Sequence, residues 1–149
     1  MAITQGVCTS FKTQMLNGEH AFGTTVIRAS TTPDVFKIAL YTSAATLGPS
    51  TTVYTTSGEV ATGAGYTAGG KILTAVQPTA TDGVAYTDFS DAIWSASSIT
   101  ARGALIYNSS QGNKAVAVLD FGADRQSSSG DFIVQFPANN QMTAIIRIT

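Results

Sequence analysis

Few residues in this sequence are suited to catalysis, because the chain has one histidine, one cysteine and two glutamates among its 149 residues. His20 directly follows Glu19, and a histidine beside a carboxylate is a pairing that general-base catalysis uses. Adjacent side chains point in different directions, so we interpret His20 as a polar loop residue. Cys8 lies beside an apolar stripe with only Lys12 as a nearby positive charge, which predicts a buried structural thiol. We therefore predict no catalytic residues and no enzymatic activity.

The chain also has few of the residues that bind metals or cofactors. A single His and a single Cys cannot form the common zinc sites, which use four cysteines, two cysteines with two histidines, or three histidines. Asp82, Asp88 and Asp91 form the densest group of carboxylates, and carboxylate oxygens are ligands for Ca²⁺. No calcium-loop pattern accompanies them, and Asp side chains at turns bond the local backbone instead. We predict that the chain holds no metal and no cofactor.

Two strings match fragments of nucleotide-binding motifs. Residues 63–70 read Gly-Ala-Gly-Tyr-Thr-Ala-Gly-Gly, but a phosphate-binding glycine loop must lead into a helix, whereas this one precedes a predicted strand. We expect a flexible loop there.

Asp120-Phe-Gly122 matches the metal-binding tripeptide of kinases, yet a β-rich chain of 149 residues has no room for the rest of a kinase site. We interpret this tripeptide as the end of a strand followed by a turn.

Arg102 lies in the middle of a predicted strand over residues 99–107. A charge in that position needs a carboxylate partner or a place at the edge of the sheet. Asp88, Asp91 and Asp120 are the candidate partners within the chain. A salt bridge to another subunit is the alternative.

Only the first segment of the chain has the hydrophobic spacing of a helix. Val7, Phe11 and Met15 fall four residues apart, which predicts a short helix over residues 4–16. Thr4 is the expected N-cap, and the Asn-Gly pair that follows the helix is typical of a helix end.

From residue 35 onward the spacing changes to two, which predicts about eight strands. These strands cover residues 35–41, 71–77, 84–89, 92–94, 99–107, 115–121, 132–136 and 142–148. Residues 42–70 form a long excursion with at most one short strand, near 53–56. Connectors rich in Gly, Asn and Ser favour turns. The predicted fold class is all-β: an antiparallel β-sandwich or barrel of about eight strands with a short N-terminal helix.

The length of the chain suits one hydrophobic core, so we predict a single β domain over residues 1–149. Residues 1–34 form an N-terminal helix and arm, which either packs on its own sandwich or docks on a neighbouring subunit. Residues 35–149 form the β body. Lys37 is expected to face away from the core of that body. If Lys37→Ala proves as damaging as Phe36→Ala, either the register is shifted by one residue or both faces of the strand are buried, and the second outcome would indicate a neighbouring subunit. The expected core face contains Phe36, Ile38, Leu40, Phe132, Val134 and Phe136.

Charge and hydropathy exclude several classes of partner. Charged residues make up 11% of the chain and the net charge is −1, so no concentrated positive charge is available for nucleic acid. No apolar run approaches the roughly 20 residues of a membrane span, and no secretion signal is visible at the start. A surface with so little charge and with many neutral Thr, Ser and Gly loops suits repeated contact with other subunits. We therefore predict a homo-oligomer.

Four strings in the chain resemble a family of small structural proteins from tailed-bacteriophage virions. They are Phe36-Lys-Ile-Ala-Leu-Tyr-Thr-Ser43, Gly65-Tyr-Thr-Ala-Gly-Gly-Lys71, Ala101-Arg-Gly-Ala-Leu-Ile-Tyr-Asn108 and Ala117-Val-Leu-Asp-Phe-Gly122. The resemblance implies a non-enzymatic component of a phage particle that is assembled in the host cytoplasm. It leads us to expect a capsid decoration or cement protein on the head exterior, bound to the major capsid protein or other virion proteins, with a homotrimer favoured by the local threefold axes of the shell.

Two alternatives remain open at the level of sequence. Within the same class, the chain is a tail, neck or fibre-base subunit of the virion. In another class, it is a carbohydrate-binding β-sandwich module. Such a module places several aromatic rings on one exposed face, whereas the single tryptophan, Trp94, lies in an apolar run and is expected in the core.

Overall fold

The computed structural model of the chain describes residues 2–25 and 32–149. The architecture is all-β with one short helix, as the sequence predicted, and every pair of strands runs antiparallel. The elements are β1 (Gly6–Val7), α1 (Thr9–Leu16), β2 (Phe36–Tyr41), β3 (Lys71–Ile72), β4 (Thr79–Thr81), β5 (Val84–Thr87), β6 (Ala92–Ser97), β7 (Thr100–Asn108), β8 (Lys114–Gln126), β9 (Gly130–Val134) and β10 (Ile146–Ile148). Residues 1 and 26–31 of the predicted N-terminal arm lie outside the described residues.

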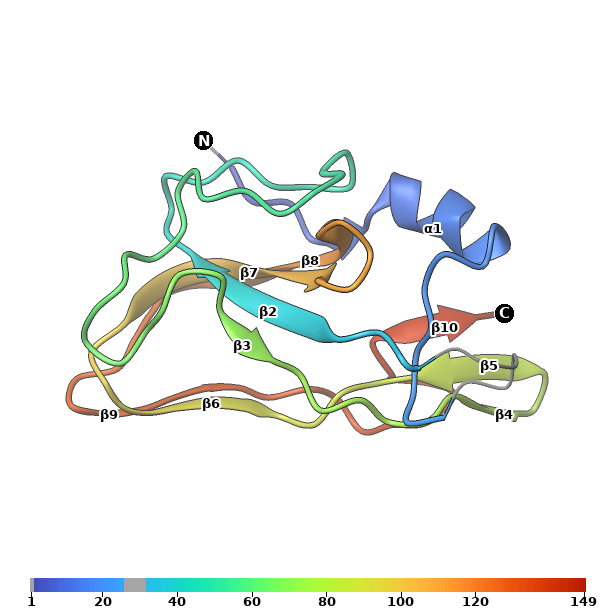
Figure 1. Cartoon of the computed structure of the whole chain (residues 1–149). Helices are drawn as coiled ribbons and strands as arrows, with labels where there is room; N and C mark the ends of the chain where they lie inside the picture. Colours follow the sequence, from blue (N-terminus) through green and yellow to red (C-terminus); the bar gives the residue numbers. More distant parts are fainter. Residues whose placement is uncertain (1, 26–31) are drawn as a thin grey trace.

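A five-stranded sheet in the order β1-β8-β7-β2-β3 forms the middle layer of the molecule. One face of this sheet is covered by α1 and by the excursion of residues 42–70 (Figure 1). The other face packs on two smaller sheets, β6-β9 and β10-β5-β4. The predicted β-sandwich is therefore present, with a third layer of loop and helix on top.

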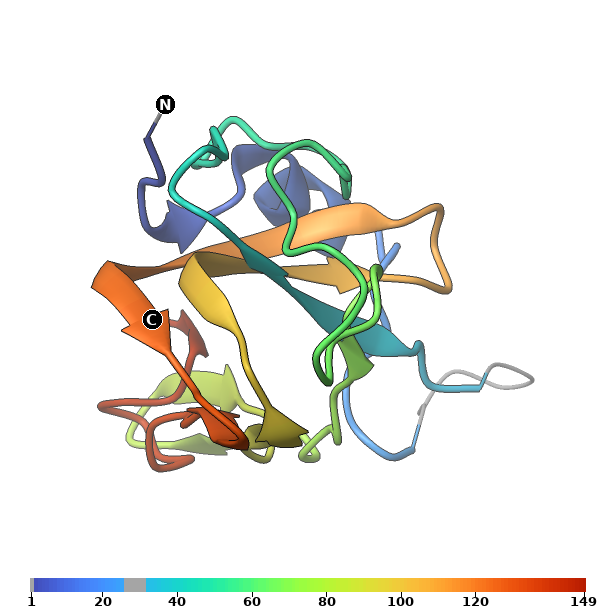
Figure 2. The ribbon, with the colours of Figure 1, turned by 90° about the vertical axis from the view of Figure 1, so that its left-hand side faces the viewer.

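The two halves of the sandwich are joined by one long hairpin that folds over on itself. Strands β7 and β8 pair in the central sheet, and the same two chain segments continue as β6 and β9 in the lower sheet (Figure 2). The bend lies at Ser97, whose hydroxyl contacts the Trp94 carbonyl at 2.9 Å, the Ser127 hydroxyl at 2.8 Å and the Gly130 carbonyl at 3.1 Å. Strands that switch sheets at a bend are a common way to make the corner of a β-sandwich.

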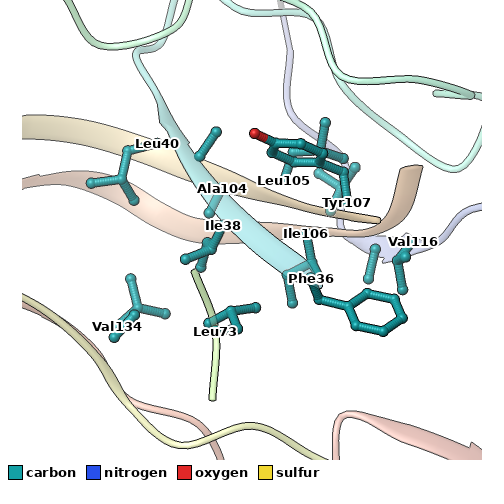
Figure 3. Packing of buried hydrophobic residues seen from close by; sticks show 14 of the residues in the cluster. Phe36, Ile38, Leu40, Leu73, Ala104, Leu105, Ile106, Tyr107, Val116 and Val134 are labelled. Carbon is teal, nitrogen blue, oxygen red and sulfur yellow. The ribbon is translucent and has the colours of Figure 1, made fainter. Parts of the chain in front are cut away.

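The predicted core face is confirmed, because Phe36, Ile38 and Leu40 are buried together with their three expected partners on and after β9. Figure 3 shows Leu73 and Val134 on the side of β2 toward which Ile38 points. The opposite face of β2 is buried as well, since Ala39 and Tyr41 are both 0% exposed and Lys37 is half-buried.

The cover of this second face comes from the chain itself, so the expectation that its burial would indicate a neighbouring subunit is wrong. The Tyr41 hydroxyl donates to the Thr55 carbonyl at 2.5 Å, and the Tyr54 ring stacks on the ring of Tyr107, the register partner of Lys37, at 4.7 Å between centroids. Both contacts come from the excursion of residues 42–70, which lies over β2 as an additional layer.

The N-terminal segment packs on its own sandwich. Cys8, Phe11 and Phe22 are buried in the same hydrophobic cluster as the central sheet. The helix begins at Thr9, five residues later than predicted, with Cys8 at the N-cap. Thr4 is not the cap, because its N–H donates to the Leu47 carbonyl at 2.8 Å. Residues 6–7 pair with the edge of β8 as β1, so the helix starts only after them.

Several strand ends differ from the prediction. The strand expected over residues 71–77 ends at Ile72, because residues 73–77 cross from the central sheet to the lower layer, where the Val76 N–H donates to the Asp88 carbonyl. β4 was not predicted; it pairs with β5 through a turn at Asp82 and Gly83, both with positive φ. The last strand is limited to β10, because the Asn140 side chain holds the preceding residues in a turn.

The interpretation of Asp120-Phe-Gly122 as a strand end is also wrong. β8 continues to Gln126, and the pairing with β7 shifts register between Gly103 and Ala101. Gly122 has φ +76°, a conformation that glycine adopts without strain, and it lies inside this irregular stretch. The tripeptide is part of a bulged strand.

Candidate functional site

Glu19 and His20 do not form a catalytic pair. The Glu19 carboxylate forms an ion pair with Lys114 on β8 and accepts a hydrogen bond from Asn17 at 3.2 Å. The Lys114 contact is the first cause of the lowered pKa of Glu19. His20 is only 7% exposed and turns inward, so its interpretation as a simple polar loop residue missed its burial.

The His20 ring is instead part of a buried polar network. Its Nε2 lies 2.8 Å from Gln14 Oε1, and its Nδ1 lies 3.0 Å from Asn108 Nδ2. Asn108 Nδ2 also donates to Asp34 Oδ2 at 2.7 Å, and the same carboxylate oxygen accepts the Ala21 N–H at 2.9 Å. The network joins the N-terminal segment to the start of β2 and the end of β7.

Aromatic rings surround His20 on its remaining sides. Phe11 packs edge-on at 4.8 Å between ring centroids, and Phe36 stacks at 6.2 Å. Burial lowers the pKa of His20, and the Asp34 carboxylate opposes that shift only in part. A neutral imidazole enclosed by the core has no access to an external substrate, so the ring serves packing and hydrogen bonding.

Cys8 agrees with its prediction as a buried structural thiol. The side chain is 0% exposed, and burial raises its pKa to about 11. A thiol in this environment stays protonated at neutral pH and is a weak nucleophile.

The glycine-rich stretch of residues 63–70 is packed against the sheet, which corrects the expectation of a flexible loop. The Glu59 carboxylate accepts hydrogen bonds from the hydroxyls of Tyr54 and Tyr66, both at 2.6 Å, and from the Gly69 N–H at 2.7 Å. The Tyr107 hydroxyl on β7 donates to the Gly69 carbonyl at 2.6 Å. Burial, followed by the nearby Glu59 charge, raises the pKa of Tyr107 to about 12. These contacts fasten the excursion to the central sheet.

The three aspartates that were weighed as calcium ligands serve separate parts of the backbone. Asp88 is buried and accepts the N–H groups of Phe89 at 2.8 Å and Ile145 at 3.3 Å. Asp91 accepts the Phe136 N–H at 2.8 Å, and Asp82 forms the β4–β5 turn. Within residues 2–25 and 32–149, no group of three His, Cys, Asp or Glu side chains is placed to hold a metal ion.

Arg102 pairs with carboxylates on the neighbouring strand. Its side chain lies 3.8 Å from Asp120 and 3.9 Å from Asp124, and it is 39% exposed. Asp120 was one of the expected partners, whereas Asp88 and Asp91 are engaged elsewhere. Asp124 was missed because the strand was predicted to end at residue 121; β8 continues to Gln126, and its bulge brings Asp124 close to Arg102.

Two partly exposed isoleucines lie on the outer face of the β6-β9 sheet, whereas the most exposed apolar side chains of the described residues, Leu16 and Met142, lie elsewhere. Ile93 and Ile133 are directly opposite each other in the register, and they are 40% and 52% exposed. Ile72 on β3, 64% exposed, lines the same groove as Ile93. We call these three residues the isoleucine face. Alternation could have located the Ile93–Ile133 pair, since each isoleucine lies between two buried residues.

Two charged side chains flank the isoleucine face. Lys71, on the β6 side, donates to the Ile93 carbonyl and lies 5.8 Å from the Trp94 ring centroid. Asp131, on the β9 side, is exposed and two residues before Ile133, so it lies on the same face of the strand. A groove of about 740 Å³ runs beside β9, between β8 and the C-terminal segment, and Asp131 and Ile133 form part of its wall.

Comparison of this chain with protein families, curated proteins and solved structures found no match. Among the residues described, no helix has the length and apolar character needed to cross a membrane.

Proposed function

We propose that the chain is a bacteriophage virion structural protein that acts by assembly, most specifically as a decoration or cement protein on the exterior of the head. The observation that carries the proposal is the isoleucine face. Ile93 and Ile133 lie opposite each other on a small outer sheet and expose apolar surface to water. Only 11% of the residues in the chain are charged. We infer a protein–protein contact here because the exposed isoleucines adjoin one another, and contiguous apolar surface can mark such contacts.

A second copy of the chain is the proposed occupant of this face. Lys71 and Asp131 place opposite charges on its two sides, which suits a head-to-tail contact in which the β6 side of one copy meets the β9 side of the next. Head-to-tail contacts of one kind close into a ring when the rotation between successive copies allows it, and a trimer is the ring that fits a threefold axis of a shell. The shell protein would then be contacted by the assembled trimer.

The carbohydrate-binding alternative receives no support from the placement of the aromatic rings. All seven Phe, five Tyr and one Trp lie in the described part of the chain, and every one of them is buried or half-buried. A sugar-stacking platform needs exposed rings. The tail, neck or fibre-base alternative stays within the same class of function and is separated from decoration by copy number.

The proposal is tested by changing the isoleucine face without disturbing the core. Ile93→Thr combined with Ile133→Thr removes apolar area from the outer face, while Ile148→Thr on β10 removes an equally exposed isoleucine elsewhere. Light scattering should show a trimer for the unmodified chain and for Ile148→Thr, and a monomer for the double variant. Binding of each protein to phage shells that lack it should follow the same order. A folded double variant that still assembles and still binds would refute the proposed contact.

A further inference from the structure

The buried hydrogen-bond network around His20 has no part in the proposed assembly contact. It places the polar side chains of His20, Asp34 and Asn108 within the hydrophobic core. It holds the one histidine of the chain between two segments that are distant in the sequence. His20 and Gln14 belong to the N-terminal segment. Asn108 is the last residue of β7, and Asp34 lies two residues before β2.

The orientation of the Asn108 amide is fixed from two sides. Its Oδ1 accepts the Ser110 N–H at 3.0 Å, and its Nδ2 donates to Asp34 Oδ2 at 2.7 Å. Rotating the amide would place its oxygen against the Asp34 carboxylate and its NH₂ against the Ser110 N–H. Asn108 therefore presents an N–H to His20, and Nδ1 of the imidazole must be the acceptor. The ring proton resides on Nε2, which donates to Gln14 Oε1.

A second proton on this ring has no acceptor. Protonation of Nδ1 would set an N–H of the imidazolium against an N–H of Asn108, and the fixed amide cannot turn to accept it. The neighbouring rings of Phe11, Phe22 and Phe36 offer no acceptor either. A buried polar group left without its hydrogen bond, and here carrying a charge, destabilises the packed state.

The charged groups that face His20 do not reverse this conclusion. Asp34 attracts the imidazolium, but its oxygens already accept from Asn108, from the Ala21 N–H and from Gln111 at 3.2 Å. Lys114 on β8 repels the imidazolium and is paired with Glu19, whose attraction is weaker.

We propose that the hydrogen bond between His20 and Asn108, whose amide Asp34 holds in place, is a pH-sensitive latch, which holds residues 9–22 on the β body at neutral pH and releases them on mild acidification. Release exposes the buried Phe11 and Phe22 rings and uncovers the face of β8 on which α1 packs. The body keeps the paired strands β2, β7 and β8, because residues 9–22 contribute no strand to their sheet.

Hydrogen exchange of the full chain tests the latch, because it reports the opening of each segment separately. A free histidine titrates near pH 6.5, so opening of residues 9–22 should increase by up to about thirtyfold between about pH 7.5 and about pH 5. Protection of β7 should change little over the same range. His20→Phe keeps an aromatic ring and removes the titration, so the opening of its segment should be the same at both pH values, even where loss of the two hydrogen bonds raises it.

A second variant separates the latch from general acid sensitivity. Gln14→Glu places a carboxylate at the acceptor of Nε2, which stabilises the imidazolium and should reduce the increase in opening. Because the chain has one histidine, its ring signals in a nitrogen-correlated NMR spectrum of the unmodified protein are unambiguous. They should show the Nε2–H tautomer at neutral pH. An Nδ1–H tautomer, an equal increase in opening for His20→Phe, or simultaneous loss of protection in β7 would each overturn the proposal.

Discussion

Gly70 offers a sharp test of how the excursion of residues 42–70 is seated on the sheet. Its φ is +73°, and a Cβ added there would lie 1.9 Å from the Ile38 carbonyl oxygen on β2. Gly83, in the β4–β5 turn, has a similar φ of +80° but nothing within 4 Å of the same added atom. Alanine would be strained by the positive φ at either position. The two positions differ in whether the added Cβ has room.

The expected losses of stability follow from that difference. Gly83→Ala should cost about 1–2 kcal/mol, which is the cost of a left-handed conformation for an L-residue. Gly70→Ala carries the same strain and must also push the loop away from β2. That shift breaks the contacts of Gly69 with Glu59 and Tyr107, worth about 1–3 kcal/mol each. The total should be at least about 3 kcal/mol, against about 5–15 kcal/mol for a whole domain.

Urea unfolding of the two variants, followed by fluorescence of the single tryptophan, measures the difference directly. A midpoint for Gly70→Ala far below that of Gly83→Ala is the expected result, and failure of Gly70→Ala alone to fold agrees with it. If the two free energies of unfolding lie within about 1 kcal/mol of each other, the excursion is not seated on β2 as described.

Three further outcomes are expected from the same kind of measurement. Phe36→Ala should lower the free energy of unfolding by about 3–5 kcal/mol, whereas Lys37→Ala, half-buried on the other face of β2, should lower it by about 1 kcal/mol. Cys8→Ser should cost about 1–3 kcal/mol, because a hydroxyl enters an apolar site, and the native thiol should react with a thiol reagent only on unfolding. Burial raises the pKa of Asp88 above its ordinary 3.8, so its contribution to stability is fully present below that value and is lost as the pH rises through the folded pKa. Asp88→Asn should remove that part of the pH dependence of unfolding.

The sequence predicted most reliably the long apolar strands of the central sheet. β2 and β7 were located to within one residue at each end, because a short apolar run bounded by turn residues is what a strand buried on both faces requires. β1 and β4 were missed, since strands of two or three residues carry almost no pattern and exist only because an edge of another strand is available. The helix start was misplaced for the same reason.

The surroundings of His20 could not be predicted from local sequence. Its partner Asn108 lies 88 residues away, and the two meet only when the N-terminal segment packs on the end of β7. The opposite holds for Ile93 and Ile133, whose outward direction follows from their buried neighbours alone. Which strand lies opposite which still required the fold, because register between distant strands is set by the packing of both.

The copy number of this chain in purified phage particles tests the proposed function most directly. Quantitative mass spectrometry of washed particles, with the major shell protein as the internal reference, gives that number. A decoration role predicts copies in proportion to the shell protein, present in multiples of three. Copies on the order of six or twelve would move the protein to the neck or tail, as expected of a single symmetric ring. Absence of the chain from washed particles that are otherwise complete would contradict a structural role in the virion.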